Sequence, residues 1–474
     1  MGKDGLDGWA SSEFSDVDLG DKRLKDRLIK MCDRFSESPE SPINQACEDW
    51  AETKAAYRFF KNGCVDAVKI LEAHASKTAE RAKKEKIILA VQDSSYLIYT
   101  SHKKTTGLGR LSMKKGKHVA EINSNGLVMH SSLALTTEGL PLGLLHQKIF
   151  PRIARTPEQK KLQDKTPIEE KESFRWLESL KESKAKVGDT KIVTVCDREA
   201  DIYEFFQLGE KIDAPLLVRA NVNRDVNKKS RYAEVNTEKL WEFMLRQPVA
   251  ATYNVNVSPH EKRTARIAQM ELRFAPFAFN PPRNNVKHRQ SKLPDLEMHA
   301  VFVRETSTPP EGEDPLEWML LTNMSVSNPE EAMEKVIWYA LRWRIEMYHK
   351  VLKSGFHIED CRLSEANRLI KYLTIMSIVA WRIFMITLVA RTSPDMPCSG
   401  FLSTSEWQVL YARMNRGKKL PKHPPSMQKV VRWIAQLGGF LGRKHDGEPG
   451  TIVLWRGWKR LADLVDGWSL ALER

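Results

Sequence analysis

The chain has 474 residues, 41% hydrophobic and 29% charged, a composition that fits a globular protein with room for two to four structural units. Its net charge of +14 favours a polyanionic partner, because clustered Lys and Arg side chains release counterions from a phosphate backbone. The six cysteines are scattered without metal-ligand spacing, and the N-terminus lacks the apolar core of a signal peptide, so we expect reduced thiols in the cytoplasm.

The first 75 residues are expected to form a small basic helical unit. Asp21 is suited to cap a helix with one apolar stripe and many Lys and Arg residues around it. A second helix is expected over 45–60. Basic and aromatic side chains on short helices suit recognition of duplex DNA, although they also occur on ordinary solvated faces.

From Lys86 the pattern changes to apolar runs that end on acids. One predicted strand ends on Asp93, and another, in the run that starts at Thr190, ends on Asp197 and passes into a helix. Further strands are expected at 126–135, at 141–150 and up to Arg219, with a polar loop over 101–118 and a helix over 168–186. Strands in series with crossover helices predict an α/β core with a mixed sheet.

Residues from about 225 to 320 are predicted to be a β-rich insertion in this core. Four strand-like runs follow one another there, at 252–257, 265–274, 297–305 and 318–323.

One long helix is expected over 327–355, with Asn328 as its N-cap, Pro329 at its first position and Gly355 at its end. At about 100° per residue, one face carries four chemically different side chains. They are Tyr339, Arg342, Glu346 and Lys353, flanked by Trp343 and Lys350. The face suggests a metal beside a nucleic-acid backbone, and an ordinary salt-bridged helix surface is the alternative.

The last part of the chain is expected to be helical. The apolar run 369–390 contains Lys371 and Arg382, and charges are costly at bilayer depth, so a buried helix is favoured over a membrane span. Shorter helices are expected after residue 400.

Asp93, Asp197 and Glu346 form the candidate catalytic set. Carboxylates and water are the ligands that Mg²⁺ prefers, and two such ions can activate the attacking oxygen and stabilise the leaving oxygen of a phosphodiester. Asp197 could instead only cap the helix that follows it, so the prediction depends on the three acids coming together.

The spacing Y-x2-R-x3-E-x6-K, formed by Tyr339, Arg342, Glu346 and Lys353, resembles the signature of the DDE transposases of bacterial insertion sequences. The likeness is to the insertion-sequence-four family and especially to the transposon-five transposase. Further motifs follow in the family's order over nearly the whole chain. They are LGDKR (19–23), AAYRFFKN (55–62), VQDSS (91–95), GLLHQ (143–147), CDREADI (196–202), RWRIEMYHK (342–350) and LGGFLGRK (437–444).

The resemblance implies a three-part architecture. A helical DNA-end-binding domain would occupy 1–75 and a ribonuclease-H-like catalytic domain 76–390, with the β-rich insertion at about 225–320. A helical dimerisation domain would follow over 391–474. In that family two Mg²⁺ ions, which Mn²⁺ can replace, are held by the residues that match Asp93, Asp197 and Glu346.

The resemblance also implies cut-and-paste transposition. Water nicks one strand at the transposon end, the freed 3′-hydroxyl forms a hairpin with the other strand, a second water opens it, and the 3′-ends attack target DNA. The hairpin step flips a base out of the stack. The matching residues are Trp318 for the vacated stack, Tyr339, Arg342 and Lys353 for the phosphates, and Trp343 for the pocket wall.

Other DNA contacts are expected from the same likeness. Arg219 would lie near DNA, or alternatively in a structural ion pair, and His349 and Lys350 would contact the backbone. His130, on an apolar strand, is expected to be a satisfied core histidine. Recognition of the terminal inverted repeats is expected from the N-terminal residues Arg23, Arg27, Tyr57 and Arg58.

The implied protein is a bacterial, cytoplasmic enzyme that works on double-stranded DNA as a homodimer, with no membrane partner. The alternatives are a catalytically silent end-binding repressor or inhibitor of transposition, and a two-metal nuclease without strand transfer.

Overall fold

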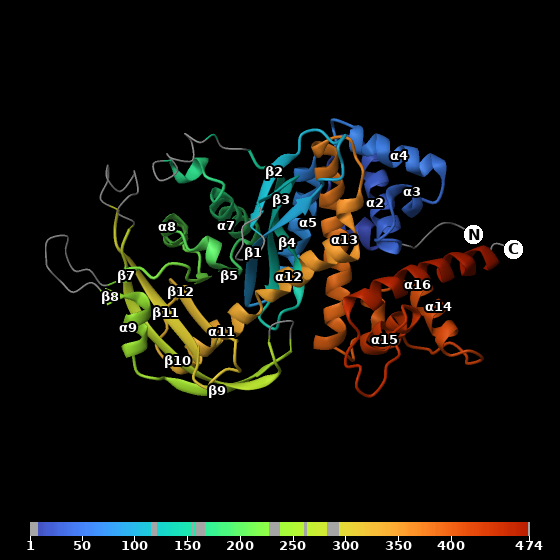
Figure 1. The fold of residues 1–474 in the computed structure, drawn as a ribbon. Helices are drawn as coiled ribbons and strands as arrows, with labels where there is room; N and C mark the ends of the chain where they lie inside the picture. The colour runs from blue at the N-terminus through green and yellow to red at the C-terminus, as the bar shows by residue number, and fades with distance from the viewer. Residues whose placement is uncertain are drawn as a thin grey trace. The chain divides into compact units, whose positions relative to one another are not determined.

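The structure is a computed structural model that describes residues 8–114, 121–153, 156, 166–226, 238–259, 263–281 and 293–472 (Figure 1). The chain forms two compact units. The sheet unit comprises residues 86–93 and 155–344, and the helical unit comprises residues 1–85, 94–154 and 345–474. Parts of the predicted insertion at 225–320 lie outside the described residues.

The sheet unit is built on a mixed sheet. The first half of β1 (Ile87–Ile98) pairs in parallel with β5 (Lys191–Cys196), and β5 pairs in parallel with β6 (Leu216–Arg219). The sheet continues with antiparallel strands from the predicted insertion. These are β12 (Glu317–Thr322), β11 (Leu296–Glu305), β10 (Arg266–Phe279), β9 (Ala251–Val257), β7 (Asp225–Val226) and β8 (Glu238–Lys239). Five of the six β5 residues are buried, which explains their near-continuous apolar run.

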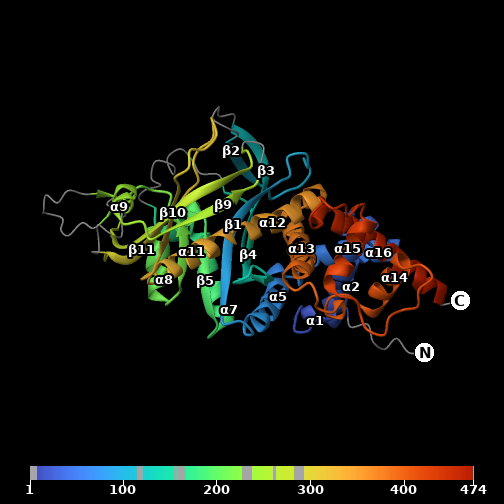
Figure 2. The same cartoon turned by 90° about the horizontal axis from the view of Figure 1, so that it is seen from below.

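Helices cover this sheet and enclose a core rich in Phe, Leu and Met. They are α7 (Phe174–Val187), α8 (Tyr203–Lys211), α9 (Leu240–Arg246) and α11 (Pro329–Ala340), with short 3₁₀ turns η2 (Ile168–Glu170) and η3 (Arg198–Ala200). The core includes Trp176, Phe205 and Phe206, which are fully buried. Figures 1 and 2 show α11 beside β10, against which it packs.

The helical unit begins with five helices from the N-terminal part of the chain. They are α1 (Trp9–Glu13), α2 (Lys22–Glu37), α3 (Ile43–Ala46), α4 (Trp50–Lys61) and α5 (Ala67–Ala82). Asp21 caps α2 as predicted, because its side chain accepts a hydrogen bond from the Arg23 N–H. The predicted helix over 45–60 is instead two helices, since the chain turns extended at Cys47 and Asp49 and α4 starts afresh with Asp49 as its own cap.

The second half of this unit is organised around α13 (Ala366–Thr392). It packs against α2, α4, α5, α15 (Met427–Leu437) and β4 (Pro141–Phe150), and its most apolar window is 94% buried. Although long and apolar enough to cross a membrane, it is the buried helix that was predicted. The strands β2 (Gly109–Lys114), β3 (Glu121–Thr136) and β4 form an antiparallel sheet. The remaining elements are η5 (Ile358–Asp360), η6 (Cys398–Gly400), α14 (Thr404–Met414) and α16 (Thr451–Leu472).

Two further expectations need correction. The prediction of a polar loop over 101–118 was wrong at 109–114, where β2 pairs with β3. The strand predicted to end on Asp93 continues to Ile98, and only its pairing with β5 stops at Gln92.

The single helix predicted over 327–355 is interrupted. Asn328 caps α11 and Pro329 starts it, but the helix stops at Ala340, and α12 (Trp343–Lys350) then leads into a π-helical turn (Val351–Gly355). Around Leu341 the backbone forms bonds to the third residue back: Arg342 N–H to Tyr339 O at 3.0 Å and Arg344 N–H to Leu341 O at 2.9 Å. The regular rotation of about 100° per residue therefore does not hold from Tyr339 to Lys353, and the prediction that their side chains share one helix face loses its basis.

The fold is thus a mixed α/β architecture with helical N- and C-terminal regions, consistent with the predicted ribonuclease-H-like core. The domain boundaries at residues 75 and 390 stay predictions.

Candidate active site

Asp93, within β1, and Asp197, directly after β5, lie just beyond the last paired residues of these neighbouring parallel strands. The last residue pair between β1 and β5 joins Gln92 to Cys196, so each aspartate is the next residue along the chain. Both carboxylates are half-buried. Two acids far apart in sequence are therefore brought to neighbouring positions in one sheet.

Asp197 also caps the 3₁₀ turn that follows it. Its Oδ1 accepts a hydrogen bond from the Glu199 N–H at 2.9 Å, which is the capping role left open from the sequence. A carboxylate has two oxygens and about four lone-pair positions, so the cap leaves Asp197 able to accept more. Glu199 in turn binds Arg175 of α7 at 2.5 Å, as a member of a structural ion pair.

Arg342, at the helix break, lies beside Asp93. Its Nη1 lies 3.9 Å from Asp93 Oδ2, and its guanidinium carbon lies 5.9 Å from the Tyr339 ring centroid and 5.6 Å from that of Trp343. Arg342 is buried, whereas Trp343 is 57% exposed. A planar cation is therefore held between a buried and an exposed aromatic ring, beside one of the two acids.

Tyr339 lies among charged groups of both signs. Burial raises the pKa of its hydroxyl, Arg342 and Arg219 oppose that rise, and Asp197 adds to it. The hydroxyl therefore stays protonated near neutral pH and can donate a hydrogen bond.

Arg219 and Trp318 come from neighbouring strands on the other side of Tyr339. Arg219 ends β6 and donates from Nη2 to the Glu317 carbonyl oxygen at 2.9 Å. Trp318, on β12, is half-buried and meets the Tyr339 ring edge-on with centroids 5.1 Å apart. The sheet unit thus brings together seven of the predicted residues: Asp93, Asp197, Arg219, Trp318, Tyr339, Arg342 and Trp343.

Glu346 belongs to the helical unit, on the part of α12 that follows Arg344. Its approach to the two aspartates stays a prediction. Among the described residues, no group of three or more His, Cys, Asp or Glu side chains is arranged to hold a metal ion. The two aspartates alone nevertheless suit Mg²⁺, which is usually bound through one or two carboxylates while water and phosphate oxygens complete its shell.

Three predicted DNA contacts lie after Glu346, in the helical unit. Lys353 Nζ donates to the Tyr96 carbonyl oxygen at 2.8 Å and lies 3.6 Å from Glu359 Oε1. Lys350 is exposed. His349 is buried, and burial together with Lys353 lowers its pKa to about 3, so its neutral ring fits a phosphate contact least well.

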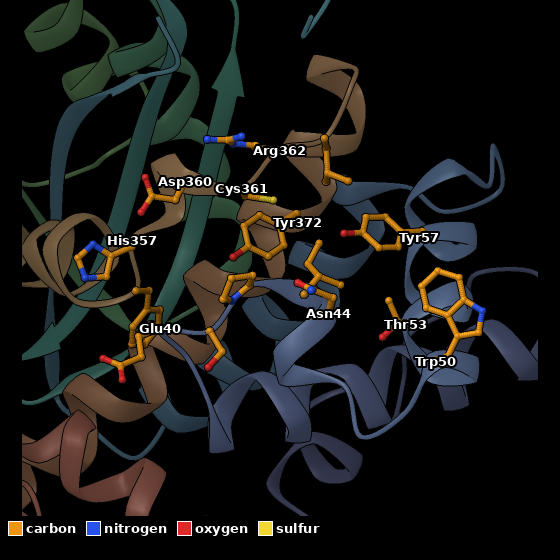
Figure 3. A pocket seen from close by; sticks show the side chains of 15 residues that line it. Glu40, Asn44, Trp50, Thr53, Tyr57, His357, Asp360, Cys361, Arg362 and Tyr372 are labelled. Atoms are coloured by element: carbon orange, nitrogen blue, oxygen red, sulfur yellow. The ribbon is translucent and has the colours of Figure 1, made fainter. Parts of the chain in front are cut away.

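Of the four residues predicted to recognise the DNA end, three are exposed, namely Arg23, Tyr57 and Arg58. The fourth, Arg27, is half-buried. Tyr57 also lines a cavity of about 610 Å³ in the helical unit. Figure 3 shows Trp50, Thr53 and Tyr57 coming to this cavity from one helix, α4. The Trp50 ring is 75% exposed, and it is an aromatic surface that the sequence-based prediction omitted.

Two supporting contacts could not be read from the sequence. Arg175 is buried on α7 and reaches Glu199, two residues after Asp197. Asp201 pairs with Arg224 and accepts from the N–H groups of Asn221 and Val222, at 2.7 and 3.1 Å, which ties the loop after β5 to the loop after β6. His130 is fully buried and hydrogen-bonded to Ser94 Oγ at 2.9 Å, so the prediction of a core histidine is confirmed.

Comparison with known proteins matches both ends of the chain to transposase families. Residues 6–65 match the family "Transposase DNA-binding", and residues 378–473 match "Transposase Tn5 dimerisation domain". Among solved structures, the chain is similar to a piggyBac transposase in a synaptic complex with hairpin DNA. The identity is 10%, over 97% of this chain and 80% of that one, and the TM-score of 0.34 is too low to bear on function.

A transposase DNA-binding module near one end and a Tn5 dimerisation module near the other identify the chain as a Tn5-like DNA transposase, which binds DNA and forms homodimers.

Proposed function

We propose that this transposase moves its element by cut-and-paste transposition. It binds terminal inverted repeats, nicks one strand at each end, forms and opens a hairpin, and joins the 3′-ends to target DNA in the bacterial cytoplasm. The observation that carries the proposal is the pair Asp93 and Asp197, each one residue beyond the last β1–β5 pair, with Arg342 Nη1 3.9 Å from Asp93 Oδ2.

The proposed catalytic set is Asp93, Asp197 and Glu346. Arg342 stands immediately before α12, and Glu346 is four residues later, a spacing that favours side chains on one helix face. This spacing supports placing Glu346 on the same side of α12 as Arg342.

The metal we propose is Mg²⁺, as two ions that Mn²⁺ can replace, held by the three acids. Bound there, such ions supply charge stabilisation for the attacking and leaving oxygens of a phosphodiester. The chain's own contribution is to fix the carboxylates: the Glu199 N–H holds one oxygen of Asp197, and Arg342 sets one side of Asp93.

The distorted DNA strand would be held by the groups beside the acids. Arg219 and Arg342 offer forked donors that match phosphate oxygens, and protonated Tyr339 offers one neutral donor. Lys353, Lys350 and Trp343 extend this clamp along α12 and the turn after it. Trp318 would fill the stack that a flipped base leaves.

The test is end cleavage by Asp197→Asn and Glu346→Gln proteins in Mg²⁺. We expect loss of at least about 100-fold in first-strand nicking, because a bound metal contributes several kcal/mol of transition-state stabilisation. Binding of the end duplex should persist. Asp213→Asn is the matched control, since Asp213 is an exposed acid of the same unit and Asn tolerates its positive φ of 50°.

Three outcomes would count against the proposal. Near-normal nicking by either variant would remove that acid from the catalytic set. End binding by the unaltered protein without any cutting in Mg²⁺ or Mn²⁺ would favour a silent repressor. Cutting without joined products would favour a nuclease that lacks strand transfer.

A further inference from the structure

The C-terminal module carries an unusually one-sided charge. The 39 residues from Trp407 to His445 contain nine Lys and Arg and no Asp or Glu, so they supply nine of the fourteen net positive charges. A typical soluble surface mixes both signs, because isolated blocks of like charge repel one another. Dimerisation alone gives no reason for this excess.

The structure locates part of this charge on the connection between α14 and α15. Arg416, Lys418, Lys419 and Lys422 are exposed there, and we call these four residues the basic loop. Within the described part of the chain, none of the four forms an ion pair. Arg432 on α15 differs, since it binds Glu448 at 2.7 Å.

The basic loop is anchored at both ends. Gly417 adopts a positive φ of 75°, and the Lys418 N–H closes the turn onto the Asn415 carbonyl oxygen at 3.0 Å. At the other end, Cys398 N–H bonds to Pro425 O at 2.9 Å, and Met427 N–H bonds to Met396 O at 2.8 Å. A loop with fixed ends loses less conformational entropy on binding than a free tail does.

We propose that the basic loop is a second DNA-contact surface, which binds the duplex backbone without reading its sequence. Four exposed cations without acid partners are suited to phosphates, and Lys supplies a point charge that makes no demand on base identity. The three helices beside the loop, α14, α15 and α16, pack on one another, so the module can form dimer contacts and present the loop from one folded body (Figure 1).

This assignment uses only the conclusion that the protein binds DNA, not the proposed chemistry of the three acids. The experiment compares Lys418→Gln/Lys419→Gln/Lys422→Gln with the matched variant Lys83→Gln/Lys84→Gln/Lys86→Gln. The control also removes three lysine charges, but from exposed positions next to an acidic residue, Glu85. Affinity for an end duplex and for an unrelated duplex is measured over a range of salt concentrations.

We expect the slope of log affinity against log salt to fall by about 2 to 3 for both duplexes with the basic-loop variant, because each lost phosphate contact removes about 0.9 from the slope. The control should leave the slope within about 0.5. Nicking of a bound end should persist in both variants, and loss of nicking by the Asp197→Asn protein tests the proposed function separately.

Three results would overturn the assignment. They are an unchanged slope in the basic-loop variant, an equal fall in the control, and an effect confined to the end duplex. Light scattering and thermal unfolding of the variants identify a misfolded or monomeric protein. The double variant Arg416→Gln/Lys422→Gln then provides a milder replacement, for which about two-thirds of the slope change is expected because two charges are removed in place of three.

Discussion

Tyr339 and Trp318 form a packing contact beside the proposed catalytic residues. Their rings meet edge-on, with centroids 5.1 Å apart, while Tyr339 also lies beside Arg342 and Arg219. The sequence alone favours a core role for a strand tryptophan. Trp318 is only half-buried, as the proposed stacking on a DNA base requires.

We expect Trp318→Ala to slow hairpin formation by about 5- to 100-fold while first-strand nicking changes little, because base stacking on an aromatic ring contributes about 1–3 kcal/mol. Both steps can be followed on one labelled end duplex. Trp318→Phe should restore most of the hairpin rate. An equal loss at the two steps would leave Trp318 with a packing role only.

At the scale of elements, a buried polar network ties α1 to α5 and β4. Glu13 of α1 accepts from His74 Nδ1 at 2.5 Å and from Arg81 Nη1 and Nη2 at 2.9 and 3.0 Å. On its other side His74 Nε2 accepts the Leu144 N–H at 2.9 Å, so the ring is neutral with its proton on Nδ1. Arg81 also lies over the Trp381 ring, 4.3 Å from its centroid.

This network predicts that acid weakens the helical unit. Burial alone would raise the pKa of Glu13, but His74 and Arg81 outweigh it and bring the value to about 2, so the stability it contributes is lost as pH falls from about 4.5 to about 2. Burial lowers the pKa of His74, so its contribution declines as pH falls below about 6.5. Urea unfolding at several pH values measures both effects.

Replacing Glu13 by Gln should destabilise the protein by about 3 kcal/mol at pH 7, because it leaves a partly buried arginine without its charge partner. It should also flatten the acid dependence. The matched change Asp16→Asn removes an exposed carboxylate that pairs with Lys77 and should leave the unfolding midpoint nearly unchanged. Similar unfolding midpoints for the two variants would contradict this account of the network.

The elements that the sequence predicted best are those with a local cause. The apolar run before Asp197 indicated the end of β5, and Asn328 with Pro329 indicated the start of α11. No local residue pattern indicated the break after Ala340. The break accompanies the burial of Tyr339 and Arg342, and Arg342 contacts Asp93, which is far away in the sequence. The ion pair of Arg175 with Glu199 was hidden for the same reason.

At the scale of the whole molecule, two glycines allow close packing of the helices that match the Tn5 dimerisation domain. A Cβ on Gly457 of α16 would lie 1.7 Å from the Ile434 carbonyl oxygen of α15, and one on Gly438 would lie 1.8 Å from the Val453 carbonyl oxygen. Both obstacles are backbone atoms, so a side chain at either position requires α15 and α16 to separate.

We therefore expect Gly457→Ala to destabilise the C-terminal module by about 1–3 kcal/mol or more and to shift the protein from dimer to monomer. Gly467→Ala is the control in the same helix, since a Cβ added there would meet no atom within 4 Å. Sedimentation of both variants over a concentration series measures the dimer. Equal dimerisation would show that this helix crossing is not needed.

The burial of α13 affects the order in which parts of the chain can fold during synthesis. Lys371 of α13 donates to the Phe60 carbonyl oxygen across 311 residues, and the same helix packs on α2, α4 and α5. A ribosome releases the DNA-binding helices long before it releases the helix on which they rest. The N-terminal helices therefore keep apolar surface exposed until α13 has been synthesised. The sheet unit lies between these segments in the sequence and makes most of its contacts within itself, so it can fold first.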